Sequence, residues 1–224
     1  MPLILILTES GVELIPKKIR NHPIIKKQTK SKNFASQLLD NALHHVAMKK
    51  LDNFNKRGRP DIAHACLLNA LGSPSCKTNN LEIYLHTINN RIFKFNPEIR
   101  IARNYNRFKG LMAKLLIEGN ITINGTKLIS EVEISLKQLI QSYKNPITML
   151  FSKKGKLIEN QLSLFEKSLT KNYIALVGCF QKDSFNKTIF NLTNNIISIS
   201  RFSLDAWIVV SKVINIYEII NNII

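Results

Sequence analysis

Five short runs of uninterrupted apolar residues constrain the fold of this 224-residue chain more than any other feature. A run without polar alternation predicts a strand that is buried on both faces. These predicted strands span residues 3–7, 81–87, 147–151, 173–177 and 196–199. Apolar residues recur at helical spacing in the stretches between them, so helices separate the strands. The sequence therefore predicts an α/β fold with a parallel sheet sandwiched by helices.

The remaining segments give a single domain over residues 1–224. Helices are predicted at residues 34–51, 63–71, 104–118, 136–144 and 204–224. Residues 119–134 alternate in polarity around Asn124-Gly125, which predicts a hairpin with a tight turn. Residues 20–33 are polar, basic and without periodicity, and they predict a flexible basic loop.

The charge of the chain points to a polyanionic partner. The formal net charge is +17, from 32 lysines and arginines against 15 acidic residues. Lysine is abundant together with asparagine and isoleucine, all favoured by A/T-rich codons, so lysine alone is weak evidence. Six of the eight arginines, however, fall in one fifth of the chain: Arg57, Arg59, Arg91, Arg100, Arg103 and Arg107. Guanidinium groups bind phosphates with two nitrogens and stack on bases, so the cluster favours a nucleic-acid surface over scattered solvated charges.

The cysteines, the adjacent histidines and the length of the apolar runs argue against a disulfide-rich, metal-binding or membrane-spanning protein. The three cysteines, Cys66, Cys76 and Cys179, are widely spaced and predict core or loop residues in a reduced compartment rather than a disulfide framework or a zinc site. His44 and His45 are adjacent, so on a helix they point about 100° apart and are unsuited to one metal. No run reaches 18 apolar residues without charge, so we expect a cytoplasmic protein that neither spans a membrane nor binds a metal.

Three segments carry a family resemblance. The first is RGRPDI at residues 57–62, preceded by LLD at 38–40 and followed by His64. The second is RIARNYNRF at residues 100–108, and the third is VG at 177–178 with ISISRFSL at 197–204. In this order, and over nearly the whole chain, they resemble the pseudouridine N1-methyltransferases of ribosome biogenesis. These enzymes form the nucleolar essential protein family of the SPOUT class, and the compact N-terminus looks like its archaeal branch.

The resemblance implies a fold, an activity and partners. The fold would be a SPOUT domain with a C-terminal trefoil knot at about residues 146–224. The activity would be transfer of a methyl group from S-adenosyl-L-methionine to nitrogen 1 of a pseudouridine in small-subunit (16S-type) ribosomal RNA, during biogenesis of the small subunit. Members of the family act as homodimers.

The resemblance also assigns residues to RNA binding. The arginines that contact RNA in the family fall on Arg59, Arg100, Arg103 and Arg107, and Asp61 takes the place of an acidic residue that braces one of them. If a helix begins near Arg100, the last three arginines share one face. We expect Asp61 and Arg103 to organise the catalytic region. The alternative for all of these residues is a network of surface ion pairs.

The cofactor-binding residues implied by the resemblance lie on three loops: Leu150, Phe151 and Ser152, then Gly178 and Asp183, then Ser198, Ile199, Ser200, Arg201, Phe202, Ser203 and Leu204. The chain departs from the family pattern at Asp183, where the family has a second glycine. Asp adopts left-handed backbone more readily than most residues, and its carboxylate complements a sulfonium. Ala102 and Ser203 replace prolines, and Asp205 replaces a serine.

Other interpretations stay open. A non-catalytic RNA-binding assembly factor of the same fold is the main alternative, and a transfer-RNA methyltransferase of this fold is a second. An apolar stripe on the last predicted helix could form a dimer interface or pack on the chain's own sheet. The stripe consists of Ile208, Val209, Val213, Ile216 and Ile220.

Overall fold

The sheet at the centre of the molecule has eight strands. The computed structural model describes residues 2–28, 37–167 and 171–223, and within them the strand order is β4-β5-β3-β2-β1-β7-β6-β8. The strands are β1 (Leu3–Ser10), β2 (Leu81–Thr87), β3 (Ile92–Phe95), β4 (Asn120–Ile123), β5 (Thr126–Val132), β6 (Ile147–Leu157), β7 (Tyr173–Gly178) and β8 (Ile196–Ser198).

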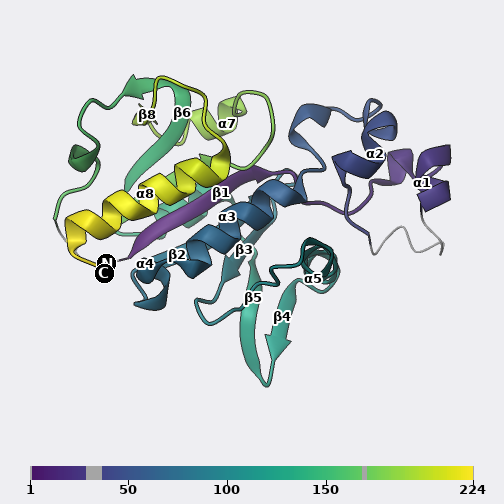
Figure 1. Cartoon of the computed structure of the whole chain (residues 1–224), viewed down its shortest axis with the longest axis horizontal. Coiled ribbons are helices and arrows are strands. Elements are labelled where there is room, and N and C mark those ends of the chain that lie inside the picture. Colours follow the sequence, from purple (N-terminus) through teal and green to yellow (C-terminus); the bar gives the residue numbers. More distant parts are fainter. Residues whose placement is uncertain (1, 29–36, 168–170, 224) are drawn as a thin grey trace.

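The five predicted strands are confirmed, and they form the parallel part of the sheet. β1 pairs in parallel with both β2 and β7, and β6 pairs in parallel with both β7 and β8. The predicted hairpin is also confirmed as β4 and β5, with Asn124 and Gly125 at φ 50° and 80° in its turn. β3 joins the hairpin to β2 by antiparallel pairing and was not predicted. The hairpin projects from the body of the molecule (Figure 1).

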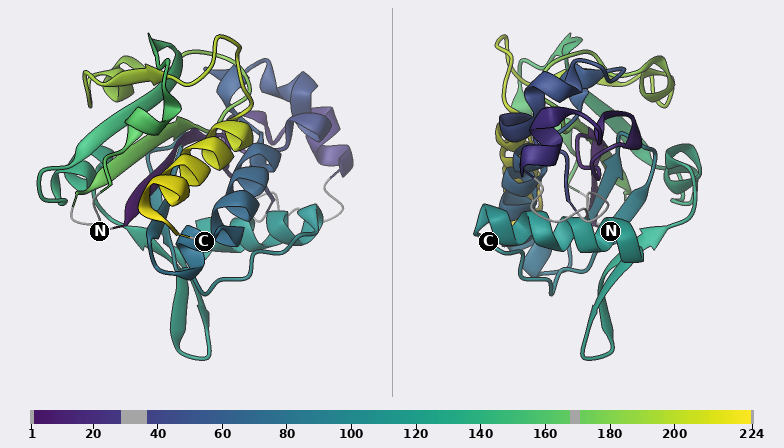
Figure 2. Two further views of the ribbon diagram at one scale, coloured as in Figure 1. Left: turned by 60° about the vertical axis from the view of Figure 1, so that its left-hand side comes forward. Right: turned by 90° about the vertical axis from the view of Figure 1, so that its right-hand side faces the viewer.

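Helices cover both faces of the sheet. The α-helices are α1 (Pro23–Gln28), α2 (Asn41–Met48), α3 (Pro60–Gly72), α4 (Pro74–Lys77), α5 (Tyr105–Glu118), α6 (Leu136–Gln141), α7 (Lys187–Phe190) and α8 (Ala206–Asn221). Short 3-10 helices are η1 (Lys17–Ile19), η3 (Phe54–Lys56) and η4 (Gln161–Leu164). α3 and α8 lie side by side over one face (Figures 1 and 2), while α6 and α7 contribute to the hydrophobic cluster on the other. The fold is therefore α/β with a covered sheet, as predicted.

Two predicted helix boundaries and one predicted loop are wrong. α2 is only eight residues long and begins after Asp40, whose carboxylate accepts the N–H of Ala42 and caps it. α3 begins earlier than predicted because Pro60 occupies its first turn, where a missing N–H costs nothing. α1 lies inside the segment predicted as a loop; the part of that loop at residues 29–33 lies outside the described residues.

The apolar stripe on the last helix packs on the chain's own core. Val213 and Ile216 are buried, and Val209 and Ile220 pack against the same cluster. Ile208 remains 39% exposed. The stripe therefore serves mainly the fold, which was one of the two alternatives. No helix in the described part of the chain is long and apolar enough to cross a bilayer.

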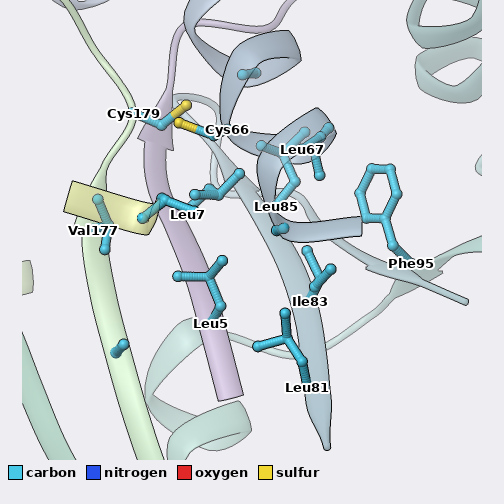
Figure 3. Packing of buried hydrophobic residues seen from close by; sticks show 14 of the residues in the cluster. Leu5, Leu7, Cys66, Leu67, Leu81, Ile83, Leu85, Phe95, Val177 and Cys179 are labelled. Carbon is cyan, nitrogen blue, oxygen red and sulfur yellow. The ribbon is translucent and has the colours of Figure 1, made fainter. Parts of the chain in front are cut away.

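The cysteines lie in the core, as predicted. All three are free and buried. The Cys66 and Cys179 sulfurs point toward each other between α3 and the ends of β1 and β7, beside Leu7 and Leu67 (Figure 3). A hydrogen bond with Cys179, together with burial, raises the pKa of the Cys66 thiol. The Cys66 thiol is therefore neutral, and both cysteines are packing residues of the core.

Two separate stretches of β6 pair with β8. Ile197 of β8 is the partner of Phe151 and also of Lys156, five residues further along β6. The intervening segment bends around Ile197, and a Cβ added at Gly155 would lie 2.5 Å from the Ile197 nitrogen. Only glycine fits this close approach of two backbones. The bend brings the middle of β6 to the edge of the cavity described next.

Candidate cofactor cavity and arginine face

A cavity of about 570 Å³ lies at the carboxyl ends of β7 and β8, beside the middle of β6. Its volume is in the range of small-molecule sites, and the carboxyl end of a parallel sheet is the usual place for one. Three loops and the start of α8 form the wall. From the predicted residues, the lining includes Phe151, Ser152, Gly178, Asp183, Ser198, Ile199, Ser200, Phe202, Ser203 and Leu204.

Ten of the twelve residues predicted for the cofactor therefore line the cavity, and two do not. Leu150 is fully buried in the second core cluster, because successive side chains of a strand point to opposite faces and Phe151 takes the cavity side. Arg201 is exposed and lies outside the lining. Neither side chain lines the cavity, and cofactor binding by these two residues stays a prediction.

The loop after β7 is shaped by aromatic packing. The Phe180 and Phe185 rings meet edge to face, with their centroids 5.3 Å apart. A Cβ at Gly178 would lie 2.8 Å from both rings, so glycine is required there. Asp183 has φ 134°, and its carboxylate accepts the N–H of Ser184 at 2.7 Å. The departure from glycine at this position therefore keeps the positive φ that the turn needs, as expected of Asp.

Several lining residues were not predicted. Trp207 and Val209 come from α8, and Ile62 comes from the first turn of α3. Lys154 lines the cavity from β6, and its Nζ donates to the Ser184 Oγ at 2.5 Å, across to the loop after β7. Trp207 lies three residues after the end of the ISISRFSL motif, and this short separation was the available signal. Nothing in the sequence marked Lys154 among the other lysines of the chain.

Arg59 is braced by Asp61. Its Nε lies 2.8 Å from one carboxylate oxygen and its Nη2 lies 2.6 Å from the other. This hydrogen bonding raises the pKa of Arg59 against the opposing effect of burial. The two side chains are 22% and 44% exposed, so the guanidinium is held in place while part of it still faces solvent. The expected pairing of Asp61 with an arginine is present in the structure.

A second cavity, of about 430 Å³, lies on the other side of Arg59. Asp40 sits in its wall and accepts hydrogen bonds from the Tyr105 hydroxyl at 3.1 Å and from the Lys109 ammonium at 3.0 Å. Burial and the nearby Asp40 carboxylate raise the pKa of Tyr105, so the hydroxyl stays a donor. Arg59 lines both this cavity and the larger one, and therefore stands between them.

The three other predicted arginines are exposed, but they do not share a helix face. α5 begins only at Tyr105, because the Asn104 side chain accepts the N–H of Arg107 and caps the helix. Arg100 and Arg103 therefore lie in the preceding loop, and the predicted spacing on one helical ridge is wrong. None of the three forms an ion pair with a carboxylate among the described residues.

The adjacent histidines differ from each other. His44 is buried, and its Nδ1 accepts the N–H of Asp40 at 3.0 Å. Burial lowers its pKa, opposed by the Asp40 charge. His45 is exposed and lies in the wall of the second cavity. Across residues 2–28, 37–167 and 171–223, no group of three or more His, Cys, Asp or Glu side chains is arranged to hold a metal.

Comparisons with known proteins point in one direction. Residues 5–218 match the family model described as EMG1/NEP1 methyltransferase. The protein named ribosomal RNA small subunit methyltransferase Nep1 from Saccharolobus solfataricus is 39% identical over 216 residues, which cover 95% of each chain. Its namesake from Archaeoglobus fulgidus is 38% identical over 214 residues, covering 94% of this chain and 93% of its own. The crystal structure of Archaeoglobus fulgidus Nep1 bound to S-adenosylhomocysteine superposes with a TM-score of 0.86 at 36% identity, covering 99% of this chain and 100% of that one.

Proposed function

Because the chain belongs to the EMG1/NEP1 methyltransferase family, we propose that it transfers a methyl group from S-adenosylmethionine to nitrogen 1 of a pseudouridine in small-subunit ribosomal RNA. The observation that carries the proposal is the position of Arg59. Its guanidinium, fixed by Asp61, lies between the cavity that fits the cofactor and the second cavity on the arginine face. A reaction between two bound groups needs such a shared boundary.

The larger cavity fits the cofactor by its chemistry as well as its volume. Apolar side chains such as Phe185, Ile199 and Leu204 offer a dry surface for an adenine ring, and the serines at 198, 200 and 203 offer hydroxyls and backbone groups. Asp183 contributes a carboxylate that complements a positive sulfonium. The related Nep1 from Archaeoglobus fulgidus was crystallised with S-adenosylhomocysteine.

The arginine face fits ribosomal RNA. Arg100, Arg103 and Arg107 are exposed on the segment that leads into α5. Unpaired guanidinium groups gain most from phosphate oxygens, which accept two hydrogen bonds from each fork. We assign these three arginines to the RNA backbone and Arg59 to the target base. A base splayed out of an RNA loop would enter between them, as sequence-specific RNA readers prefer.

The reaction exchanges one bond for another. The cofactor supplies an electrophilic methyl group on its sulfonium. Attack by the ring nitrogen forms the N–C bond as the S–C bond breaks, and the proton on nitrogen 1 leaves to solvent. Arg59 faces the ring and favours the anionic form that precedes or accompanies attack, by the logic of an oxyanion hole. Asp61 acts through Arg59 by holding its orientation, and Arg103 aligns the RNA strand.

The proposal includes one domain over residues 1–224, a trefoil knot within residues 146–224, and a homodimer in the cytoplasm. The bend of β6 around Ile197 supports the knot, since it leads one strand around another. Phe202, at the mouth of the cavity, is 77% exposed, and exposed aromatic residues are typical of interface anchors. Light scattering coupled to gel filtration tests the dimer: the wild type should elute with the mass of two chains, and Phe202→Ser with a larger monomer fraction.

The central experiment uses two RNA hairpins that differ only in having pseudouridine or uridine at one loop position. With labelled S-adenosylmethionine, label on the pseudouridine hairpin alone supports the proposal. Label on both would replace it with a uridine-tolerant activity. Label on neither, with both hairpins bound, would favour the non-catalytic assembly factor. A transfer-RNA stem-loop in the same assay tests the remaining alternative, which predicts label on that RNA instead.

A further inference from the structure

A buried ion pair lies behind the loop that follows β7. The Lys56 ammonium lies 3.0 Å from the Glu9 carboxylate, and both side chains are 2% exposed. Burying two charges costs several kcal/mol per ion, and an apolar pair of the same volume is often as stable. Stability alone therefore does not explain why two charged side chains occupy this place.

Glu9 is turned toward this position by the backbone of β1. The pairing of β1 with β2 shifts register between Leu7 and Ser10, which places Glu9 in a bulge. Its φ is 50°, a left-handed conformation that is uncommon for Glu. His86 holds this conformation, because its Nδ1 accepts the N–H of Glu9 at 3.2 Å. Bulges of this kind redirect a side chain, and here the Glu9 carboxylate contacts the Lys56 ammonium and the Asn186 N–H.

Lys56 reaches the same point from η3. Asn53 at φ 53° starts this short helix, and the Lys56 N–H donates to the Asn53 carbonyl at 2.9 Å. The Lys56 backbone packs on Gly11, where an added Cβ would lie 2.6 Å from the Lys56 oxygen. Lys56 is therefore fixed at its backbone, and its long side chain extends into the protein with little freedom.

Both charged groups contact the loop after β7. The Lys56 ammonium donates to the Asn186 Oδ1 at 3.1 Å and lies 5.0 Å from the centre of the Phe180 ring. The Asn186 N–H in turn donates to the Glu9 carboxylate at 3.3 Å. At the start of the loop, Cys179 is fastened by backbone hydrogen bonds to Thr8 and Gly11. The loop is thus held at both ends, and its middle residues line the larger cavity.

We infer that Glu9 and Lys56 are positioning residues that hold the loop at residues 179–186 in the shape that binds the cofactor. The inference rests on the proposed function of the larger cavity. Neither residue lines the cavity, so Lys56 acts through Phe180 and Asn186, and Glu9 acts through Asn186 and Lys56. Since Lys56 and Arg59 share one short segment, the cofactor loop and the RNA-facing arginine are anchored by the same piece of chain.

The chain supplies a matched control in the next residue. Arg57 forms an ion pair with Glu13, with two nitrogen–oxygen distances of 2.6 Å, and Glu13 is also 2% exposed on its side chain. This pair faces a different cavity, of about 260 Å³, and has no contact with the loop at residues 179–186 among its described partners. Arg57→Met therefore removes a similar ion pair from the same segment without touching the cofactor loop.

The test compares Lys56→Met with Arg57→Met by two readouts. The first is titration with S-adenosylhomocysteine, followed by fluorescence of Trp207, the only tryptophan in the chain, which lines the cavity. The second is amide hydrogen exchange of residues 179–186 in the protein without ligand. Both variants should unfold at a lower temperature. Lys56→Met alone should raise the dissociation constant about tenfold and speed exchange in the loop.

A double variant separates positioning from mere charge balance. Glu9→Gln with Lys56→Met removes both buried charges and should recover much of the lost thermal stability, while the loop exchange and the weak binding persist. Recovery of affinity in the double variant would overturn the inference, as would equal affinity of Lys56→Met and the wild type. If the wild type itself fails to bind S-adenosylhomocysteine, the proposed function is lost, and hydrogen exchange still decides whether Lys56 holds the loop.

Discussion

Two sets of arginines in one part of the chain are held in opposite ways. Arg57, Arg59 and Arg91 each place two guanidinium nitrogens on one carboxylate. The exposed arginines at positions 100, 103 and 107 have no such partner within the described ranges. The paired set is already neutralised and partly buried, so the charges of Arg57 and Arg91 mainly serve the fold. The unpaired set keeps its charge for an outside anion.

The contrast teaches that clustering of arginine along the sequence overstates the nucleic-acid surface. Half of the cluster forms ion pairs with carboxylates of the chain itself. Arg59 is the exception in the paired set, because it is paired with Asp61 and yet lines both cavities. Substitution of a paired arginine should lower the unfolding free energy, whereas substitution of an unpaired arginine should weaken RNA binding. Measuring both quantities on the same variants tests this difference.

The largest expected effect is on stability, at Arg57. Arg57→Met leaves the Glu13 carboxylate buried without its partner, which should cost about 3 to 4 kcal/mol of unfolding free energy. Arg103→Met should cost less than about 0.5 kcal/mol, as exposed surface substitutions do. Urea denaturation measures both. A loss of RNA affinity in folded Arg57→Met, larger than that in Arg103→Met, would break the comparison.

Protonation of the buried His86 should lower the unfolding free energy by nearly as much as Arg57→Met does. Burial lowers its pKa from 6.5 to about 4, so the unfolded chain binds more protons between these values. Its contribution is complete above pH 6.5 and is lost as the pH falls toward 4, by about 3 kcal/mol.

The measurement is the difference in unfolding free energy between wild type and His86→Gln from pH 7 to 4. An unchanged slope in His86→Gln would mean that another group carries the effect.

On the unpaired side, Arg103→Ala should weaken RNA binding about tenfold, or about 1.4 kcal/mol, with unchanged stability. The slope of log K against log salt should become shallower by about 0.7 to 0.9, because the variant neutralises one phosphate fewer. Arg103→Lys should restore the slope but only part of the affinity, because an ammonium lacks the fork. An Arg103→Ala variant with the wild-type salt slope would remove Arg103 from the RNA surface.

The smallest effect is expected for Asp61→Asn, which leaves Arg59 without its carboxylate partner. Asp61→Asn frees the guanidinium, so RNA affinity should stay within about twofold of the wild type. Methyl transfer should fall about fivefold, or about 1 kcal/mol, because the fork is no longer oriented. Single-turnover rates and filter binding on the same RNA separate the two. Equal rates in both proteins would deny Asp61 its bracing role.

Much of the parallel sheet was predictable because its strands contain mainly apolar runs, which a soluble fold usually buries. β3 was missed because it is only four residues long and carries Lys94 on its exposed side. The helix predicted at residues 104–118 is confirmed as α5, but a start near Arg100, which the arginine spacing suggested, is wrong because the Asn104 side chain caps the helix. Local capping outweighed the periodicity there.

The site was predictable where family motifs cover it and not beyond. Residues near glycines and serines of the three loops were found, whereas Lys56 and Lys154 were invisible among many lysines. A lysine in a basic stretch is usually solvated, and only the fold reveals that Lys56 turns inward to Glu9. The pairing of Arg57 and Arg91 with glutamates 44 and 40 residues away was equally beyond sequence reasoning.

The position of β1 between β2 and β7 delays completion of the sheet while the chain is being synthesised. Leu3 pairs with Leu81 on one side and with Tyr173 on the other. At about 5 to 20 residues per second, the ribosome needs roughly ten to thirty seconds to supply the second partner after the first strand. During that interval one edge of an apolar strand stays open to wrong partners, which makes it a natural client for chaperones. The segment that holds Arg100, Arg103 and Arg107 leaves the ribosome before β6, β7 and β8, so it exists before the larger cavity can form.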